Sequence, residues 1–285
     1  AISRLRSYTP PSTNYFSLPL TRRAAVLILL YADRQGDLRV VLTMRAKTLS
    51  SYAGQAALPG GKADTLLETP FQTARREAYE EIGLPLSDTR LPPPFRIHHL
   101  CELPTSFART ELGVRPCIAF IDPSSQQSTS SSRRTTRSST QIDTLPSAED
   151  VLIPRLDAKE VAAVFTAPFE SFLSTTLSTP SSAHAAPERS AWYGGQWIEW
   201  HGDRWRMHNF YVPSSDQPVA WAESPATTMT MNRFRVFGMT ARILVDAARI
   251  AYGREPEFEH NTHLGDEDMI GRLLRENKLG EREKK

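Results

Sequence analysis

Three glutamates, Glu77, Glu80 and Glu81, lie close together in the chain. In a helix, the spacing i, i+3 and i+4 places their carboxylates on one face. Like charges in that arrangement repel, and a cation bound between them removes the repulsion. Carboxylate oxygens are hard ligands that suit Mg²⁺ or Mn²⁺. The trio therefore indicates a divalent metal site, and a solvated acidic helix face is the competing interpretation.

The flanking residues predict one short helix that is entered from a glycine-rich loop. Thr69 is a favourable N-cap, Pro70 suits the first helical position, and Gly83 is typical of a helix end. Glu68 and Arg76 can pair across the junction between loop and helix. An apolar stripe on the other face is expected to pack on a sheet. It consists of Phe71, Ala74, Ala78 and Ile82.

This pattern resembles the Nudix box, Gly-x5-Glu-x7-Arg-Glu-aliphatic-x-Glu-Glu-x-Gly-aliphatic. The chain differs from it in two places. One extra residue lies between Gly61 and Glu68, and Ala78 takes the aliphatic position. The resemblance implies an α/β fold, the Nudix α/β/α sandwich with a mixed β-sheet. It also implies a hydrolase that uses Mg²⁺ or Mn²⁺ to cleave a diphosphate bond.

The same resemblance implies roles for single residues. Arg76 and Glu68 would orient the site without reacting. The general base would be one of the glutamates, with Glu80, Glu81 and the more distant Glu160 as candidates. Glu160 lies in a stretch similar to one in coenzyme A Nudix enzymes, and a surface glutamate at the start of a strand is the alternative. The implied metal ligands are Glu77, Glu80, Glu81 and the Gly60 carbonyl.

The segment upstream narrows the resemblance to one subfamily. Residues 42–46, Leu-Thr-Met-Arg-Ala, followed by residues 58–61, Leu-Pro-Gly-Gly, resemble the additional motif of coenzyme A diphosphatases. Ser50 stands where that motif has a second arginine. The resemblance implies hydrolysis of coenzyme A or its derivatives to a 4′-phosphopantetheine product and adenosine 3′,5′-bisphosphate. The implied substrate contacts are Arg45, which would meet a phosphate, and Thr43, Gln55 and Gly61.

Two other functions remain open at this point. The first is a Nudix pyrophosphatase for oxidised nucleoside triphosphates or other nucleotide diphosphate derivatives. The second is a non-catalytic Nudix module that binds a nucleotide. The complete set of three glutamates argues against the second, and a side-by-side substrate panel separates the first from coenzyme A hydrolysis.

Charge and composition limit the partners. The 285 residues include 34 basic and 32 acidic ones, a net charge of +2, so no overall field attracts nucleic acid or a membrane. No apolar run is long enough to span a bilayer. We expect a small nucleotide substrate of the coenzyme A type, and the sequence leaves the oligomeric state open. Two cysteines in a chain of this length favour buried thiols in a reducing compartment. The resemblance implies an intracellular protein, peroxisomal first, with mitochondrion and cytosol as alternatives.

Composition also divides the chain. We expect an N-terminal arm at residues 1–20, the Nudix domain at 21–253, and a tail at 254–285 with one amphipathic helix from Asp266 to Asn277. Residues 123–148 are rich in Ser, Thr and Arg, and we expect a disordered insertion there because they bury too little apolar area to offset their ordering entropy.

Hydrophobic patterning predicts the elements around the site. Residues 24–31 and 38–44 are expected to form a hairpin, with further strands at 96–104 and 112–121. A short helix is expected at 168–177, and a longer one begins near Val236 and continues through Ile250.

The segment 192–212 is rich in aromatic residues and is expected to form strands joined by turns at Gly194-Gly195 and at residues 201–203. The aromatic cluster either stacks on an adenine ring or packs as a sheet face. His260 and His263 are interpreted as ordinary loop histidines, because no third metal ligand lies near them in the sequence.

Overall fold

The computed structural model describes residues 1–45, 55–123, 147–153, 161–177, 192–214, 220–221 and 233–280. The strands are β1 (Arg23–Ala32), β2 (Leu38–Arg45), β3 (Ala56–Ala57), β4 (Gly60–Lys62), β5 (Arg96–Glu102), β6 (Ser106–Phe107), β7 (Gly113–Asp122), β8 (Val161–Pro168), β9 (Tyr193–Trp200), β10 (Asp203–Pro213), β11 (Ala220–Trp221) and β12 (Arg233–Phe237). The α-helices are α1 (Ile2–Ser7), α2 (Pro70–Ile82), α3 (Ala148–Val151), α4 (Gly238–Tyr252) and α5 (Glu267–Arg275). Short 3₁₀ turns lie at Tyr15–Ser17, Leu20–Arg22, Asp88–Arg90 and Glu170–Leu173.

The central sheet is mixed, and its strands follow the order β11-β8-β2-β1-β7-β5. Strands β1 and β7 run parallel, whereas β1 and β2 form the predicted antiparallel hairpin. The short strands β3, β4 and β6 pair with β2, β1 and β7. The α/β class with a mixed sheet is therefore confirmed.

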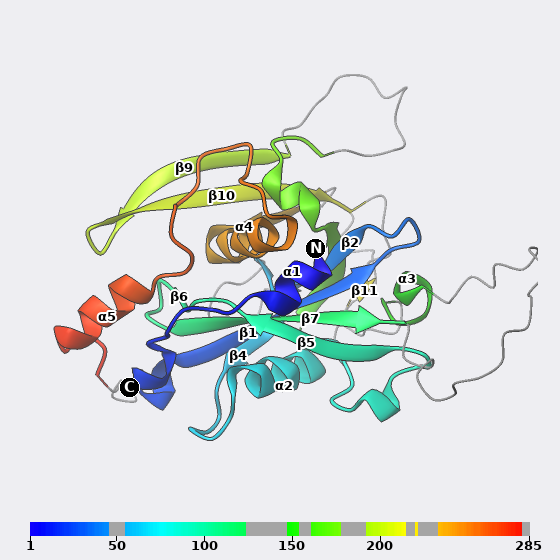
Figure 1. Cartoon of the computed structure of the whole chain (residues 1–285), viewed down its shortest axis with the longest axis horizontal. Helices are drawn as coiled ribbons and strands as arrows, with labels where there is room; N and C mark the ends of the chain where they lie inside the picture. Colours follow the sequence, from blue (N-terminus) through cyan, green and yellow to red (C-terminus); the bar gives the residue numbers. More distant parts are fainter. Residues whose placement is uncertain are drawn as a thin grey trace, which may run out of the picture.

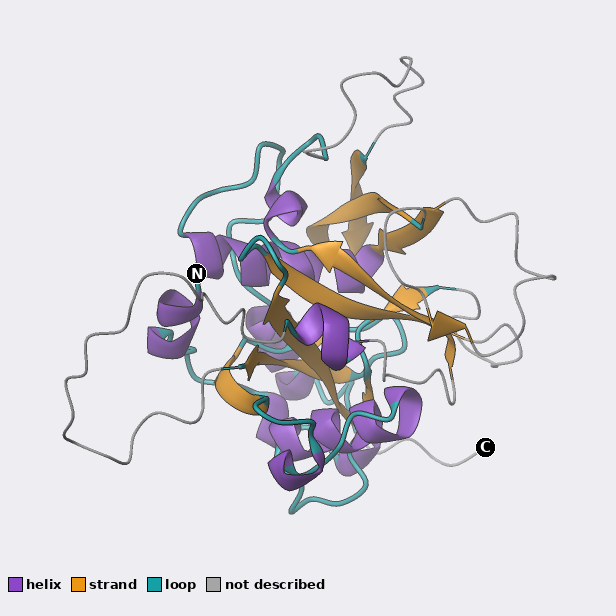
Figure 2. Cartoon of the chain, turned by 90° about the vertical axis from the view of Figure 1, so that its right-hand side faces the viewer, coloured by secondary structure: helices purple, strands orange, loops and turns teal. Residues whose placement is uncertain are grey.

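Helices cover both faces of the central sheet (Figure 1). Helix α2 lies on one face, and α4 with the short α1 lies on the other. Figure 2, at right angles to the first view, also shows helices on both sides of the central strands. A second sheet, β12-β10-β9, covers the outer side of α4. The predicted three layers are thus present, and a β layer that the sequence analysis did not predict lies above them.

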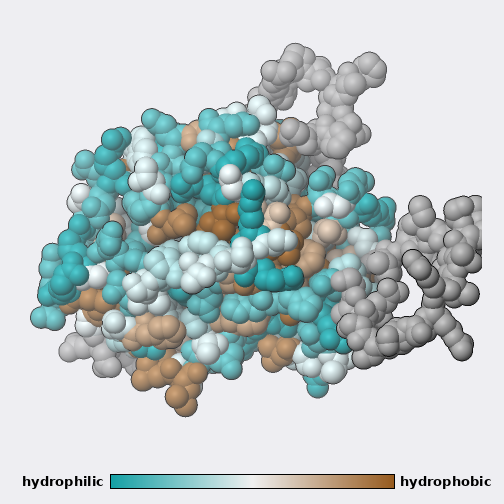
Figure 3. All heavy atoms as spheres, in the orientation of Figure 1, coloured by the Kyte–Doolittle hydropathy of each residue, from teal (hydrophilic) through white to brown (hydrophobic). Residues whose placement is uncertain are grey.

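Each face of the central sheet has its own apolar core. Leu27, Leu29 and Ala119 point toward α2, where they meet Ala78 and Ile82. The opposite face packs on α4, and the core there continues into the second sheet. It includes Ile28, Leu30, Leu42, Phe165, Ile243, Leu244, Ala247, Phe210 and Phe234. Figure 3 shows a mainly hydrophilic outer face, with apolar atoms confined to limited areas. Burial of these residues fixes α2 and α4 on opposite sides of β1.

Helix α2 begins and ends where the sequence predicts. The Thr69 side chain accepts a hydrogen bond from the Gln72 N–H, and the Gln72 side chain accepts one from the Thr69 N–H, which completes a capping box. Gly83 ends the helix with a φ of 68°, a left-handed conformation that glycine adopts without strain. These local signals fix the register of the acidic face of α2.

The glycine-rich entry to α2 is a short strand rather than an open loop. Gly60 and Gly61 pair with Val26 and Ala25 of β1. A Cβ built on Gly60 would lie 2.3 Å from the Ala25 carbonyl oxygen, so no larger residue fits there. The pairing holds the Gly60–Gly61 backbone beside Glu77 and Glu81 in the second half of α2.

Two local predictions about the second half of the chain were wrong. The helix predicted at 168–177 is only a 3₁₀ turn at Glu170–Leu173. Gly194 and Gly195 do not form a turn, because they lie inside β9 and pair with β10. A Cβ on Gly195 would meet the Tyr193 hydroxyl at 2.3 Å, so glycine leaves room for that side chain. The turn predicted at 201–203 does join β9 to β10.

Both ends of the described chain pack on the central layers. Leu5 of α1 is fully buried against the core that contains α4. In α5, Met269, Ile270 and Leu273 are buried, as predicted for the amphipathic helix. Glu267 accepts hydrogen bonds from the Asn14 N–H at 2.7 Å and the Thr105 N–H at 2.8 Å. These contacts join the two terminal segments to each other and to the sheet.

Other predictions have mixed outcomes. Most of the predicted insertion at 123–148 lies outside the described residues, except that Ser147 and Ala148 start α3. Cys101 and Cys117 are both buried and free, as expected. Among the described helices, none combines the length and the apolar character needed to cross a membrane.

Candidate active site

Arg76 is the centre of the acidic cluster on the second half of α2. Its Nε donates to Glu68 at 2.9 Å, and its Nη1 donates to Glu77 at 3.0 Å and to Glu80 at 3.3 Å. Its Nη2 donates to the Lys62 carbonyl at 2.8 Å. The predicted pairing of Glu68 with Arg76 is confirmed, and one guanidinium joins loop, strand and helix.

The Glu68 carboxyl is held in its charged form. Burial by itself raises its pKa, but hydrogen bonds from Arg76 and from the Asp64 N–H outweigh burial, and the pKa of Glu68 falls below its ordinary value. The hydrogen bond to Glu68 likewise raises the pKa of Arg76, against the effect of its own burial. Glu68 and Arg76 are therefore a stable ion pair that fixes the loop between β4 and α2.

Glu77 lies directly under the Gly61 backbone. A Cβ built on Gly61 would come within 2.5 Å of the Glu77 carboxyl group, so the close approach requires glycine. Burial raises the pKa of Glu77, and the neighbouring Arg76 only partly offsets this effect. A carboxylate that is costly to ionise gains from any added positive charge.

Glu81 is buried on the same side of the helix, where it meets the other glycine. Its Oε2 accepts a hydrogen bond from the Gly60 N–H at 3.2 Å, and its Oε1 lies 3.7 Å from Nη1 of Arg45. The structure thus brings Arg45, Gly60, Gly61, Glu77 and Glu81 together at the point where β2, β4 and α2 meet.

The three glutamates do not surround a common point. Within the described residues, no group of three or more His, Cys, Asp or Glu side chains is arranged to hold a metal ion. Arg76 lies between Glu77 and Glu80, and Glu81 turns toward Gly60 and Arg45. The three glutamates occupy one face of α2 as predicted, but their carboxylates do not converge, and Arg76 and Arg45 lie next to them.

The donor set still fits a divalent ion. Glu77, Glu80 and Glu81 lie on consecutive turns of α2, with Glu77 beside Gly61 and Glu81 beside Gly60, and carboxylate oxygens are the ligands that Mg²⁺ and Mn²⁺ prefer. The Arg76 guanidinium already places a positive charge between Glu77 and Glu80.

Other predicted site residues fall into two groups. Glu160 lies outside the described residues. Thr43 is fully buried, and its hydroxyl donates to the Ala57 carbonyl at 3.3 Å, so it supports β3 instead of facing substrate. Arg45, Gln55, Gly60 and Gly61 all border one cavity. Among the described atoms, Nε of Arg45 is buried without a hydrogen-bond partner.

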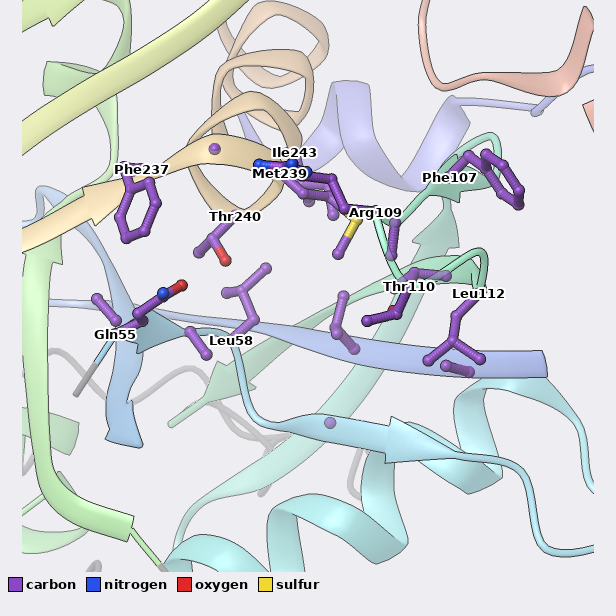
Figure 4. Close-up of a pocket in the computed structure, with 18 of the residues that line it drawn as sticks. Gln55, Leu58, Phe107, Arg109, Thr110, Leu112, Phe237, Met239, Thr240 and Ile243 are labelled. Carbon is purple, nitrogen blue, oxygen red and sulfur yellow. The ribbon is translucent and has the colours of Figure 1, made fainter. Parts of the chain in front are cut away.

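The cavity has a volume of about 730 Å³ and extends from Gly60–Gly61 to the second sheet. Figure 4 shows its side chains, with Gln55 and Leu58 on one side, Thr240 and Met239 of α4 above, and Phe107, Arg109 and Leu112 on the other side. Most of the wall is apolar. Aromatic residues that border it include Phe107, Trp200, Trp205 and Phe237.

Only part of the aromatic cluster belongs to the cavity. Trp192, Tyr193 and Phe210 pack in the core with Phe172 and Phe258 instead. These residues support the interpretation as a packed sheet face. Trp200 and Trp205 lie at the other end of the hairpin and border the cavity, where an aromatic ring can meet a base.

The sequence analysis missed two features of this region. Arg109 and the first turn of α4 border the same cavity as Gly60. These residues are far apart in the sequence, so only the tertiary fold brings them to the cavity.

His260 lies in a loop, as predicted, but its side chain has specific polar partners. It is buried, and it lies 2.8 Å from Asp246 and 2.8 Å from His208, which in turn lies 3.1 Å from the Tyr193 hydroxyl. Burial, aided by His260 and two arginines, lowers the pKa of His208 to about 2. This chain of polar groups joins α4 to the second sheet and does not border the cavity.

Part of the chain matches a known family of protein domains. The NUDIX domain family profile matches residues 21–102, which contain β1, the glycine strand and all of α2. Glu77, Glu80, Glu81 and Arg76 all lie within the matched segment, so residues 21–102 are similar to a NUDIX domain.

The chain is also similar to individual proteins along part or most of its length. The chain is 28% identical to peroxisomal coenzyme A diphosphatase 1 of Saccharomyces cerevisiae, over 94% of this chain and 80% of the relative. It is 30% identical to the mitochondrial Nudix hydrolase 15 of Arabidopsis thaliana, over 83% of this chain and 61% of the relative. The chain also matches the crystal structure of the M. smegmatis Nudix hydrolase RenU at 30% sequence identity and a TM-score of 0.25. The match covers 36% of this chain and 59% of RenU. The chain spans about three fifths of the plant protein.

Proposed function

We propose that this protein hydrolyses the diphosphate bond of coenzyme A or its derivatives, giving a 4′-phosphopantetheine product and adenosine 3′,5′-bisphosphate, with Mg²⁺ or Mn²⁺. The observation that carries the proposal is the cavity. Arg45 and the Gly60–Gly61 backbone stand at one end, and the volume of about 730 Å³ beyond them has mostly apolar and aromatic walls. Coenzyme A has the same combination of a diphosphate, an adenine ring and a long uncharged arm.

Two further observations support this substrate. The motif at residues 42–61 resembles that of coenzyme A diphosphatases. The yeast relative that aligns with 94% of the chain is named as one. The same relative supports a peroxisomal location, which stays a prediction that fluorescence microscopy of the tagged protein would test.

We assign the site residues as follows. Glu77, Glu80, Glu81 and the Gly60 carbonyl would hold the divalent ions. When bound, such ions neutralise charge on the diphosphate oxygens and lower the pKa of the attacking water. Arg76 holds Glu77 and Glu80 through its hydrogen bonds. The metal and the arginine would therefore act on the same carboxylates.

Arg45 would bind a substrate phosphate, because its buried Nε has no partner among the described atoms and its Nη1 lies near Glu81. Gly61 and Gln55 border the same end of the cavity and would contact substrate there. Thr43 would not contact substrate, because its buried hydroxyl donates to the Ala57 carbonyl.

In the proposed reaction a water oxygen attacks one phosphorus of the diphosphate. The new phosphorus–oxygen bond forms as the bond to the bridging oxygen breaks, and the second phosphate leaves with that electron pair. A glutamate takes the proton from the water, with Glu80, Glu81 and Glu160 as the candidates. Of these, Glu81 is held in place by the Gly60 N–H at 3.2 Å. Positioning of charge supplies most of the rate enhancement in such a transfer.

The test is a substrate panel. Purified protein with Mg²⁺ or Mn²⁺ is incubated with coenzyme A, an oxidised nucleoside triphosphate and a dinucleoside polyphosphate, and the products are separated by chromatography. We expect adenosine 3′,5′-bisphosphate and 4′-phosphopantetheine from coenzyme A. Faster cleavage of another compound, with none of coenzyme A, would select the broader pyrophosphatase. Binding without any cleavage would select the non-catalytic module.

A further inference from the structure

The turn between β6 and β7 carries a cation to the edge of the cavity. The Ala108 N–H donates to the Leu112 carbonyl at 2.9 Å, and the Glu111 N–H donates to the Ala108 carbonyl at 2.7 Å. Glu111 also pairs at 2.9 Å with Arg22, whose side chain is only 7% exposed. The turn is thus fixed from its outer side, and Arg109, Thr110 and Leu112 border the cavity.

Arg109 is a cation without a protein counter-ion. Among the described residues it makes no salt bridge, unlike Arg45, which lies near Glu81, and Arg76, which is shared by several carboxylates. Figure 4 shows its side chain extending from the turn toward Met239 and Ile243 of α4. The guanidinium therefore lies over apolar cavity wall instead of projecting away from the cavity.

The end of α4 that faces Arg109 adds positive potential. Gly238, Met239 and Thr240 border the cavity, and the helix starts there without a side-chain cap. The N–H groups of a first helical turn carry partial positive charge. Arg109 is exposed, so water solvates its charge in the free protein, and with this end of α4 it makes one edge of the cavity positive and suited to an anionic group.

We propose that Arg109 is a specificity-determining residue that binds an anionic group of the substrate other than the diphosphate that is cleaved. The proposal rests on the proposed function. In coenzyme A the pantetheine arm and the adenine are uncharged, so the only remaining anion is the 3′-phosphate of the ribose. Arg45 and Gly60–Gly61 would hold the diphosphate, while Arg109 holds the 3′-phosphate in the same cavity.

The experiment compares two substrates that differ only in this phosphate. Initial rates are measured for coenzyme A and for 3′-dephospho-coenzyme A with wild-type protein and with Arg109→Ala. We expect the variant to lose about five- to tenfold in kcat/KM for coenzyme A and to be unchanged for the dephospho substrate. Arg96→Ala is the matched control, because Arg96 is an exposed arginine on β5 that does not border the cavity, and it should change neither value.

The outcomes are separable. An equal loss on both substrates would mean that Arg109 supports the fold or the diphosphate, and the inference would be wrong while the proposed function stands. If wild-type protein cleaves neither substrate, the proposed function fails, and calorimetry decides the inference. Wild-type protein should then bind adenosine 3′,5′-bisphosphate about five- to tenfold more tightly than adenosine 5′-monophosphate, and Arg109→Ala should abolish the difference. Equal affinities in the wild type would overturn the inference.

Discussion

Arg76→Gln is the substitution that most directly tests how the acidic face of α2 is held together. In the wild type the guanidinium donates to Glu68 at 2.9 Å, to Glu77 at 3.0 Å and to the Lys62 carbonyl at 2.8 Å. The side chains of Glu68 and Glu77 are 14% and 18% exposed, so water compensates little of the loss. Glutamine is neutral and too short to reach all these acceptors.

The expected loss of stability follows from these contacts. A hydrogen bond to a charged group contributes about 1.5–3 kcal/mol. Because the Arg76 side chain is itself 22% exposed, we take the lower end for each of the two glutamates. The free energy of unfolding should fall by about 3 kcal/mol, which corresponds to a decrease in Tm of about 6–12 °C for a domain of this size.

The assay is urea denaturation, followed by circular dichroism, of protein prepared without divalent ions. Arg34→Gln is the matched control, because Arg34 pairs with Asp150 where the two side chains are 65% and 39% exposed. The control should retain the midpoint of the wild type. If Arg76→Gln unfolds at the same urea concentration as Arg34→Gln, the reasoning about the acidic cluster is refuted.

Three other predictions concern the site and the second sheet. Glu81→Gln should lower kcat with Mg²⁺ by about a hundredfold or more, and calorimetry should show weaker magnesium binding; full activity would exclude Glu81 as a ligand and as the base. Gly61→Ala should displace the Glu77 carboxyl and lower kcat, whereas Gly194→Ala, where a Cβ meets nothing within 4 Å, should not. The pKa of His208 is about 2 in the folded protein and about 6.5 when unfolded, so the unfolded chain binds the extra proton below pH 6.5. Stability should therefore be full above pH 6.5 and fall by about 1.4 kcal/mol per pH unit below it, and His208→Gln should flatten that part of a denaturation series.

The elements that the sequence predicted well are those fixed by local signals. Helix α2 has its capping box at Thr69 and its left-handed glycine at position 83, and both signals act within one turn. The β1–β2 hairpin follows from two apolar runs around a short turn. The pairing of Glu68 with Arg76 could be expected because Glu68 directly precedes the N-cap of α2 and Arg76 carries the opposite charge two turns into the helix.

The features that were missed depend on contacts between distant segments. Gly194 and Gly195 suggest a turn, but a long partner strand keeps them in β9. The carboxylates of the three glutamates do not converge, and Glu81 lies instead near Arg45, which belongs to the distant strand β2. His260 meets His208 only after the second sheet folds over α4, so no local pattern could place it.

The buried ion pair between Arg242 and Asp266 sets a limit on how the gene can be shortened. Their closest atoms are 2.5 Å apart, and the side chains are 1% and 2% exposed. A truncation after Gly253, the predicted domain boundary, would remove both Asp266 and the Gly265 carbonyl to which Arg242 donates, and breaking such a buried pair costs about 3–5 kcal/mol. Asp266 also accepts the Phe107 N–H at 2.8 Å, which steadies the turn that presents Arg109. A shortened gene that lacks α5 would thus yield a less stable protein with a less firmly held turn at Arg109, so α5 belongs to the folded unit.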